Sequence, residues 1–305
     1  MISIMRFVLI LLLASLIGPA VPAQTARAFS IEGHRGARGY LPENTIPSFE
    51  KAIELGADTV ELDVVISSDK KVVVSHDHWF SHLISLDPKG EHIPKEKEKE
   101  HNIFLMPYSR VKLYDVGSLG NPGFPEQKPL KAHKPLLSEV FKALDKFTKA
   151  RKLPLVRYNI EIKSAPEWDG KFHPDPAEFS SLVLKEIKRA KMAGRVKVQS
   201  FDVRPLQELR KLDPSIPIAL LVGNRDGVEK SIERLGFNPA AYSPHFSLLD
   251  EVTVLYCREN GIKLIPWTAN TIADLEKAAR FDIDGVITDY PDRAVSVFRN
   301  RLPRK

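Results

Sequence analysis

Residues 32–77 set the pattern for the whole chain, and they read EGHRGARGYLPENTIPSFEKAIELGADTVELDVVISSDKKVVVSHD. Histidine, arginine and acidic residues stand at the ends of its short apolar runs, notably 58–66 and 71–76. A hydrophobic core seldom contains such groups, whereas enzyme sites form where titratable side chains meet at strand ends. We therefore expect an enzyme site in this stretch.

Strand-like and helix-like segments alternate from this stretch onward. Ile46, Phe49 and Ile53 recur at helical spacing before Gly56, which predicts a helix over 45–55. Apolar runs predict strands at 30–36, 58–66, 71–76, 155–163, 195–201, 216–222, 240–243, 262–267 and 285–288. Helical spacing predicts helices at 136–148, 176–192, 203–212, 227–235, 247–260, 272–281 and 293–301.

This order of elements predicts an α/β fold. The turn sequence SSDK at 67–70 lets 58–66 and 71–76 pair as a hairpin, which we count as one strand position. Eight βα units then predict a (β/α)8 TIM-like barrel with an inserted subdomain after the second strand or hairpin. An open doubly wound sheet is the alternative, but no glycine-rich phosphate loop follows the first strand.

The segment from about 78 to 134 interrupts the alternation. It contains six prolines and no sustained periodicity, and a structureless loop of this length is unusual in a compact domain. We expect an inserted subdomain or lid with little regular structure. Its apolar side chains either form a small core of their own, which we favour, or contact an acyl chain: Phe80, Leu83, Ile84, Phe104, Leu105, Met106 and Tyr108.

The charge of the chain is nearly balanced, with 45 basic and 39 acidic residues among 305. Basic residues are dispersed beside acidic ones, as in KEKEKE at 95–100, which indicates a solvated surface and no nucleic-acid partner. Cys257 is the only cysteine, so no intramolecular disulfide can form. The hydrophobic core alone must stabilise the domain.

The first residues resemble an export signal. Arg6 precedes the apolar run 7–17, and the small-residue sequences VPA at 21–23 and ARA at 26–28 offer cleavage sites. We expect a signal peptide over 1–23, with cleavage as late as 28, and a barrel domain over 29–305. An uncleaved N-terminal anchor is the alternative, although the run is shorter than the ~20 apolar residues that span a bilayer. The expected product is periplasmic or secreted and keeps no stable membrane anchor.

The predicted barrel brings polar residues together at the C-terminal ends of its strands. Glu61 and Asp63 face the same side because they are two residues apart on one strand. The other polar residues expected at this rim are His34, Arg35, His76, Glu161, Lys163, Gln199, Ser200, Trp267, Thr288 and Asp289. We expect the remaining histidines on the surface or in loops, with His78 and His82 as further candidates for the rim: His78, His82, His92, His101, His133, His173 and His245.

These side chains predict phosphoryl transfer. The carboxylates of Glu61, Asp63 and Glu161 suit a hard divalent cation, Ca²⁺ or Mg²⁺, better than zinc. Positive side chains beside that cation, Arg35 and Lys163, suit an anionic phosphate group. His34 and His76 titrate near neutrality and fit a general acid and base pair.

Several motifs resemble the glycerophosphodiester phosphodiesterase family across residues 30–300. They are GHRG at 33–36, PENT at 42–45, GAD at 56–58, ELDV at 61–64, VVVSHD at 72–77, NIEIK at 159–163, QSF at 199–201, PWTAN at 266–270 and DGVITDYP at 284–291. The resemblance implies a TIM-like barrel that hydrolyses glycerophosphodiesters, such as glycerophosphocholine or glycerophosphoethanolamine, to sn-glycerol 3-phosphate and an alcohol. It also implies a divalent cation.

The same resemblance assigns roles residue by residue. His34 and His76 are implied as the acid and base, and Glu61, Asp63 and Glu161 as metal ligands. The implied substrate-binding residues are Arg35, Lys163, Glu43, Asn44, Gln199 and Trp267. A lipid phosphodiesterase of the lysophospholipase D kind and a non-catalytic phosphodiester-binding protein remain as alternatives. The sequence leaves the oligomeric state open.

Overall fold

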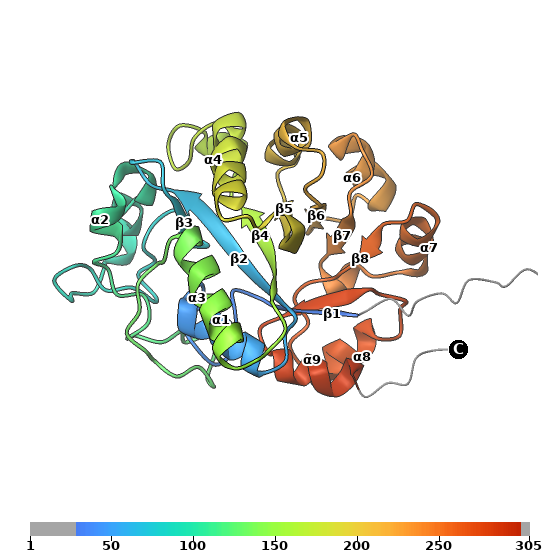
Figure 1. Ribbon diagram of the computed structural model, residues 1–305, viewed down its shortest axis with the longest axis horizontal. Helices are drawn as coiled ribbons and strands as arrows, with labels where there is room; N and C mark the ends of the chain where they lie inside the picture. The colour runs from blue at the N-terminus through green and yellow to red at the C-terminus, as the bar shows by residue number, and fades with distance from the viewer. Residues whose placement is uncertain (1–28, 300–305) are drawn as a thin grey trace, which may run out of the picture.

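The apolar runs of the sequence form a barrel of parallel strands in the computed structural model, which describes residues 29–299 (Figure 1). Neighbouring strands follow the order β8-β7-β6-β5-β4-β2-β1-β9, and β3 pairs with β2 in an antiparallel hairpin. The predicted (β/α)8 barrel is therefore confirmed. The strands are β1 (Ser30–Gly33), β2 (Thr59–Ile66), β3 (Val72–Val74), β4 (Arg157–Ile162), β5 (Val196–Ser200), β6 (Ile218–Val222), β7 (Ala241–Pro244), β8 (Lys263–Leu264) and β9 (Gly285–Thr288).

The barrel closes between β8 and β9 without a regular strand ladder. Strand β8 is shorter than the predicted 262–267, since Pro266 has no N–H to donate to a neighbouring strand. Single backbone hydrogen bonds close the seam instead. The N–H of Asp284 donates to the carbonyl of Leu264 at 2.8 Å, and the N–H of Ile287 donates to the carbonyl of Pro266 at 2.9 Å.

Helices cover the outside of the barrel (Figure 1). Thr45 caps the first of them, and Phe49 and Ile53 bury its inner face against the sheet. The last helix begins at Pro291, two residues before the predicted start, because proline fits the first helical position. The outer helices are α1 (Ile46–Glu54), α3 (Leu137–Ala150), α4 (Pro176–Arg189), α5 (Val203–Leu212), α6 (Val228–Leu235), α7 (Glu251–Glu259), α8 (Ile272–Ala278) and α9 (Pro291–Phe298).

Strand alternation separates an apolar layer from a polar interior. In β2, Leu62 and Val64 face the helices and belong to the main core, whereas Glu61 and Asp63 point into the barrel. The interior also has an apolar side, formed by Ala219, Ala241, Ile265 and Ile287. Polar side chains therefore occupy only part of the barrel interior.

The insertion between β3 and α3 contains only short helices: η1 (Lys95–Glu100), η2 (Ile103–Leu105) and α2 (Tyr108–Val111). Its core forms against the β2–β3 hairpin, and the ring of Phe80 stacks on Tyr114 with centroids 3.6 Å apart. Met106 is also buried there, whereas Leu83 and Leu105 are 53% and 70% exposed. The insertion therefore has the small core that we favoured, although not every apolar side chain joins it.

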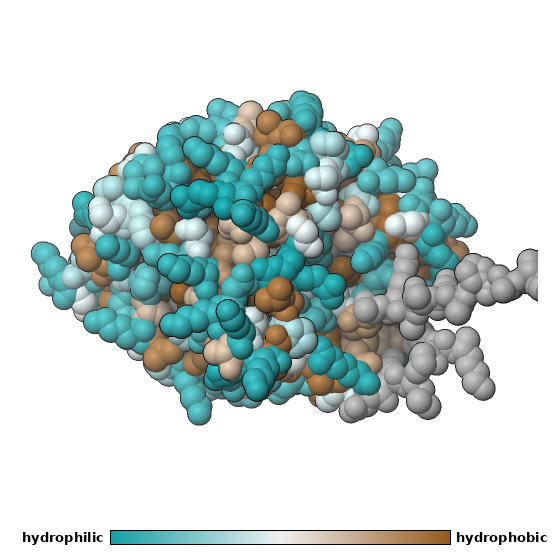
Figure 2. All heavy atoms as spheres, in the orientation of Figure 1, coloured by the Kyte–Doolittle hydropathy of each residue, from teal (hydrophilic) through white to brown (hydrophobic). Residues whose placement is uncertain are grey.

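The surface carries mainly hydrophilic side chains on the face drawn in Figure 2, with hydrophobic ones scattered among them. No helix within residues 29–299 is both long and apolar enough to cross a membrane. The predicted signal peptide, residues 1–23, lies outside the described part of the chain.

Phe80→Ala should destabilise the protein by about 3–5 kcal/mol, because it removes a fully buried ring and leaves a cavity beside Tyr114. Chemical denaturation measures the loss. Leu105→Ala, in the same insertion, should stay within about 0.5 kcal/mol of wild type because that side chain is exposed. Equal stability of the two variants would contradict the packing described for the insertion.

Candidate active site

The turn after β1 places two predicted site residues. Arg35 and Gly36 adopt positive φ angles of 51° and 91°, and Asn44 adopts 55°. Such angles are costly for residues other than glycine and persist where the surrounding structure fixes them. The N–H of Arg35 donates to Glu61 at 2.8 Å, and the N–H of Asn44 donates to the carbonyl of Arg35 at 3.0 Å. The strained turn thereby orients a carboxylate.

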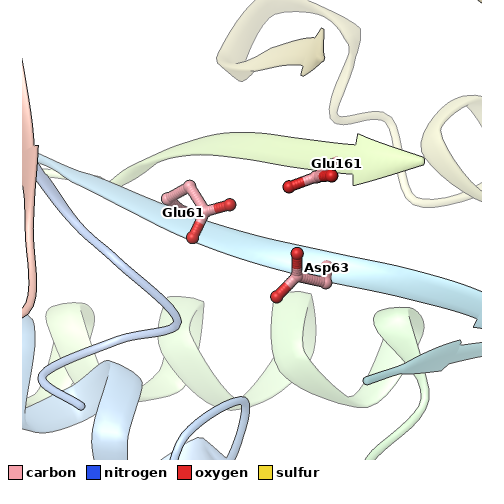
Figure 3. Close-up of side chains that lie close together, drawn as sticks. All are labelled: Glu61, Asp63 and Glu161. Carbon is pink, nitrogen blue, oxygen red and sulfur yellow. The ribbon is translucent and has the colours of Figure 1, made fainter. Parts of the chain in front are cut away.

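The three predicted metal ligands converge inside the barrel (Figure 3). Glu61 and Asp63 extend from β2 and Glu161 from β4, and their ligand atoms lie within 4.8 Å of one another. The parallel register causes this, because Asp63 pairs directly with Glu161. All three residues are buried, and Oδ1 of Asp63 lacks a hydrogen-bond partner among the described residues. A cluster of oxygen ligands with an unsatisfied carboxylate atom fits a hard divalent cation.

Crowding of these carboxylates changes their pKa values. Burial, together with Asp63 and Glu161, raises the pKa of Glu61 well above its usual range. Burial likewise raises the pKa of Glu161 to about 7. Burial alone would also raise the pKa of Asp63, but the charges of Arg35, His76 and Lys163 outweigh it and hold that pKa below its usual value. Asp63 is therefore the carboxylate of the three that ionises most readily in the absence of a cation.

Two cationic side chains flank the cluster. Lys163 Nζ lies 2.7 Å from Oε1 of Glu161 and 3.9 Å from Oδ1 of Asp63. Arg35 donates from Nη1 to Glu43 at 2.8 Å, and its Nε lies 3.4 Å from Oδ2 of Asp63. Both positively charged side chains therefore lie beside the predicted metal site, where carboxylates hold them in place.

Asn44 and Glu43 support this arrangement from the loop before α1. The side-chain amide of Asn44 donates to Oδ2 of Asp63 at 2.8 Å and accepts the N–H of Asp63 at 3.2 Å. Glu43 contacts Arg35 and also Arg38, whose Nη1 is 3.6 Å from Oε2 of Glu43. Asn44 therefore contacts the carboxylate cluster, and Glu43 contacts the two arginines. Neither residue lines the cavity at this site.

Each predicted histidine contacts a carboxylate through Nδ1. His34 Nδ1 lies 2.7 Å from Oδ1 of Asp289, and His76 Nδ1 lies 2.8 Å from Oδ1 of Asp77. The pKa of each aspartate is lowered to about 2 despite burial, through the histidine that it contacts. An ionised carboxylate only accepts hydrogen bonds, so each Nδ1 carries the proton. Nε2 is then the nitrogen left to exchange a proton with a ligand.

Burial favours the neutral form of both histidines. Burial lowers the pKa of His34, although Asp289 acts in the opposite direction. Burial and the nearby charges of Arg35 and Lys163 lower the pKa of His76. Neutral imidazoles fixed in one tautomer suit proton transfer through Nε2.

A hydrogen-bonded line crosses the barrel interior and ends on Glu61. Gln199 donates from Nε2 to Oε1 of Glu61 at 3.0 Å and accepts from Asn159 at 2.8 Å. Asn159 also donates to Glu32 at 2.8 Å, and Glu32 pairs with Lys197 at 2.7 Å. Gln199, predicted to bind substrate, therefore orients the Glu61 carboxylate.

A cavity of about 200 Å³ opens at this site, and its lining includes His34, Arg35, His76 and Lys163 together with Glu61, Glu161 and Gln199. Trp267 closes one side, with its indole N–H donating to the carbonyl of Ser243 at 2.9 Å. A larger cavity of about 490 Å³ beside α6 contains none of the predicted metal ligands or histidines. The side chains, rather than the cavity volume, identify the site.

Sequence reasoning missed several contacts in this site. Asp289 was expected at the rim without a role, yet it orients His34 and contacts Arg38, whose Nε is 3.3 Å from Oδ1. Lys134 comes from the end of the insertion, and its buried Nζ donates to Ser75 at 2.7 Å. The TDYP motif was the available signal for Asp289, whereas nothing in the aperiodic insertion indicated Lys134.

Two of the remaining histidines, which we predicted on the surface or in loops, are buried. His78 and His173 lie in loops but are 1% and 0% exposed. Aromatic rings bury them, because Trp168 and Phe172 pack around His78 with ring centroids at 5.2 and 6.5 Å. No periodicity in the sequence marks this packing.

Comparisons with known proteins agree with the geometry. Residues 34–293 match the model of the glycerophosphoryl diester phosphodiesterase family. The chain belongs to this family. A glycerophosphodiester phosphodiesterase from Caldanaerobacter subterraneus subsp. tengcongensis is 32% identical over 87% of this chain and 96% of its own. One from Bacillus subtilis (strain 168) is 30% identical over 85% and 83%.

A crystal structure gives the same result for the fold. The putative glycerophosphoryl diester phosphodiesterase of Silicibacter pomeroyi DSS-3 has a TM-score of 0.79 at 27% identity, covering 89% of this chain and 93% of that one. The protein is therefore an enzyme of the glycerophosphodiester phosphodiesterase family, with an acidic cluster that can hold a metal ion.

The affinity of this phosphodiesterase for Ca²⁺ or Mg²⁺ should be at least about tenfold lower at pH 6 than at pH 8, because Glu161, with a pKa of about 7, must lose its proton before it binds a cation, and the pKa of Glu61 is raised as well. Isothermal titration calorimetry of the metal-free protein measures this. Glu161→Gln should bind either cation weakly at both pH values. A dissociation constant that does not change between pH 6 and 8 would contradict the prediction.

Gln199→Met should weaken cation binding about 10- to 100-fold, because Glu61 loses the amide that orients it. Gln207→Met is a matched control, since Gln207 donates to the carbonyl of Leu235 at 3.2 Å on the outer helices. Calorimetry on both variants tests this. The orienting role of Gln199 fails if both variants bind the cation as wild type does.

Proposed function

We propose that the protein hydrolyses glycerophosphodiesters, such as glycerophosphocholine and glycerophosphoethanolamine, to sn-glycerol 3-phosphate and an alcohol in a cation-dependent reaction. One observation carries the proposal. His34 and His76, each oriented by an aspartate, line the same cavity as Glu61, Glu161 and the cations of Arg35 and Lys163. Family membership supports the reaction class.

Arg35 and Lys163 would bind the phosphate group. Both line the cavity and both are already held by carboxylates, so little side-chain freedom is lost when an anion arrives. Burial increases the strength of these charges toward a ligand because water screens them poorly. A phosphodiester anion suits this environment better than a neutral ester.

Glu61, Asp63 and Glu161 would hold the cation, Ca²⁺ or Mg²⁺. The oxygen-only ligand set supports this assignment, as does Oδ1 of Asp63, which accepts no hydrogen bond from the described residues. When bound, the cation would neutralise charge on the phosphate oxygens. It would also relieve the repulsion among the three carboxylates, so the protein itself favours the loaded state.

His34 and His76 would transfer the protons of the reaction. Their Nδ1 atoms are fixed on Asp289 and Asp77, so one Nε2 removes a proton from the attacking hydroxyl or water. The other, which takes up a proton from solvent on its Nε2, gives that proton to the oxygen of the departing alcohol. Each aspartate stabilises the imidazolium that forms during this exchange.

A substrate panel with metal add-back tests the proposal. The purified protein should release sn-glycerol 3-phosphate from glycerophosphocholine, lose this activity in EDTA and regain it with CaCl₂ or MgCl₂. Turnover of lysophosphatidylcholine in preference to glycerophosphocholine would favour a lysophospholipase D instead. Tight binding without turnover of any compound would favour a binding protein.

His34→Ala and His76→Ala should each lower kcat by about 10²- to 10⁴-fold, the usual contribution of a general acid or base. His92→Ala is the control, because His92 lies exposed in the insertion. Full activity of either site variant would sink the proposed proton transfer. Circular dichroism on all three variants separates lost chemistry from lost folding.

A further inference from the structure

A second cavity, of about 240 Å³, opens directly beside the site. Four residues line both cavities: His76, Glu161, Lys163 and Phe201. A phosphate held by Lys163 and the cation therefore has space on two sides for its two ester substituents. This second cavity lies on the side of His76, away from His34.

Aromatic side chains form the far wall of this second cavity. Trp79 comes from the insertion and Trp168 from the loop after β4, and their rings lie 5.9 Å apart at 75° to each other. The two segments are bound together, because the side chain of Asn102 donates to the carbonyl of Lys171 at 2.8 Å. We call this space, lined by Trp79, Trp168 and Phe201, the aromatic pocket.

The hydroxyl groups of the aromatic pocket are already engaged. Ser164 donates to Asp202 at 3.0 Å, and Ser200 donates to the carbonyl of Ile162 at 2.8 Å. The ring nitrogens of His78 are buried, so they are not exposed to the pocket. A ligand that needs several hydrogen bonds, such as a polyol or a primary ammonium group, finds few partners here.

The charges around the aromatic pocket favour a cation. Asp77 lines it and is ionised, since His76 holds its pKa at about 2 despite burial. The charge of Lys163 is offset by Glu161 at 2.7 Å, and burial keeps His78 neutral by lowering its pKa to about 3. Trp79 already attracts one cation, because Nζ of Lys99 lies 5.2 Å from its ring centroid.

We propose that the aromatic pocket binds the departing alcohol and selects one that carries a quaternary ammonium group, such as choline. This inference rests on the proposed hydrolysis of glycerophosphodiesters. Aromatic faces attract a quaternary ammonium group, which has no N–H to leave unsatisfied, and Asp77 adds a negative charge. Ethanolamine would be bound less well, because Asp77 can replace only part of the hydrogen bonds that its ammonium makes to water, and the rings of Trp79 and Trp168 replace none of them.

A pair of substrates of the same shape isolates this effect. Glycerophosphocholine and its neutral analogue, in which 3,3-dimethylbutanol replaces choline, differ by one charge. The wild-type enzyme should have a kcat/KM about tenfold higher for glycerophosphocholine. Trp168→Leu should reduce this preference to about twofold or less, whereas Trp168→Phe, which keeps an aromatic face, should retain part of it.

Control variants keep the test decisive. Leu105→Ala, exposed in the same insertion, should keep the full preference. Trp79→Leu provides a second variant if Trp168→Leu does not fold. Equal kcat/KM for the two substrates in wild type, or an unchanged preference in both leucine variants, would overturn the inference. Hydrolysis of neither substrate would count against the proposed function. Calorimetric binding of glycerophosphocholine against the analogue would then still decide which ligand the pocket prefers.

Discussion

The repulsion among buried carboxylates is the constraint on which the rest of the site depends. Glu61, Asp63 and Glu161 lie within 4.8 Å of one another in the barrel interior, where water cannot screen their charge. Arg35 and Lys163 offset part of this charge, and the amides of Asn44 and Gln199 satisfy individual oxygens. These neighbouring groups therefore stabilise the carboxylates even before a substrate binds. A metal ion held by this cluster would complete the balance.

The arrangement of the barrel interior follows from the same constraint. Glu32, Asn159 and Gln199 carry hydrogen bonds across one half of the interior, whereas Ala219 and Ile287 contribute to an apolar half. A polar group left unpaired in such a place costs about 1–3 kcal/mol, so these hydrogen bonds support the barrel, although Oδ1 of Asn159 has no hydrogen-bond partner among the described residues. The same hydrogen bonds thus stabilise the barrel and orient the Glu61 carboxylate.

Strand periodicity was enough to predict the barrel and much of the site. The two-residue spacing of Glu61 and Asp63 fixed their common direction, and the strand pattern around Glu161 placed it next to them. The pairing of His34 with Asp289 depends on barrel closure, which no local pattern specifies. The burial of His78 depends on aromatic packing between the insertion and the loop after β4. Contacts across long sequence distances were therefore the part that the sequence did not reveal.

The separation of His34 and Asp289 by 255 positions affects how the enzyme comes into being. Strand β1 emerges first during synthesis, yet it must wait for β9 before its histidine gains an orienting carboxylate. Contacts between distant segments form late because closing a long loop costs chain entropy. A growing chain that has completed β2 and β4 already carries its acidic cluster, but not an oriented His34. The orientation of His34, and with it the proposed proton transfer, is therefore delayed until the polypeptide is almost entirely translated.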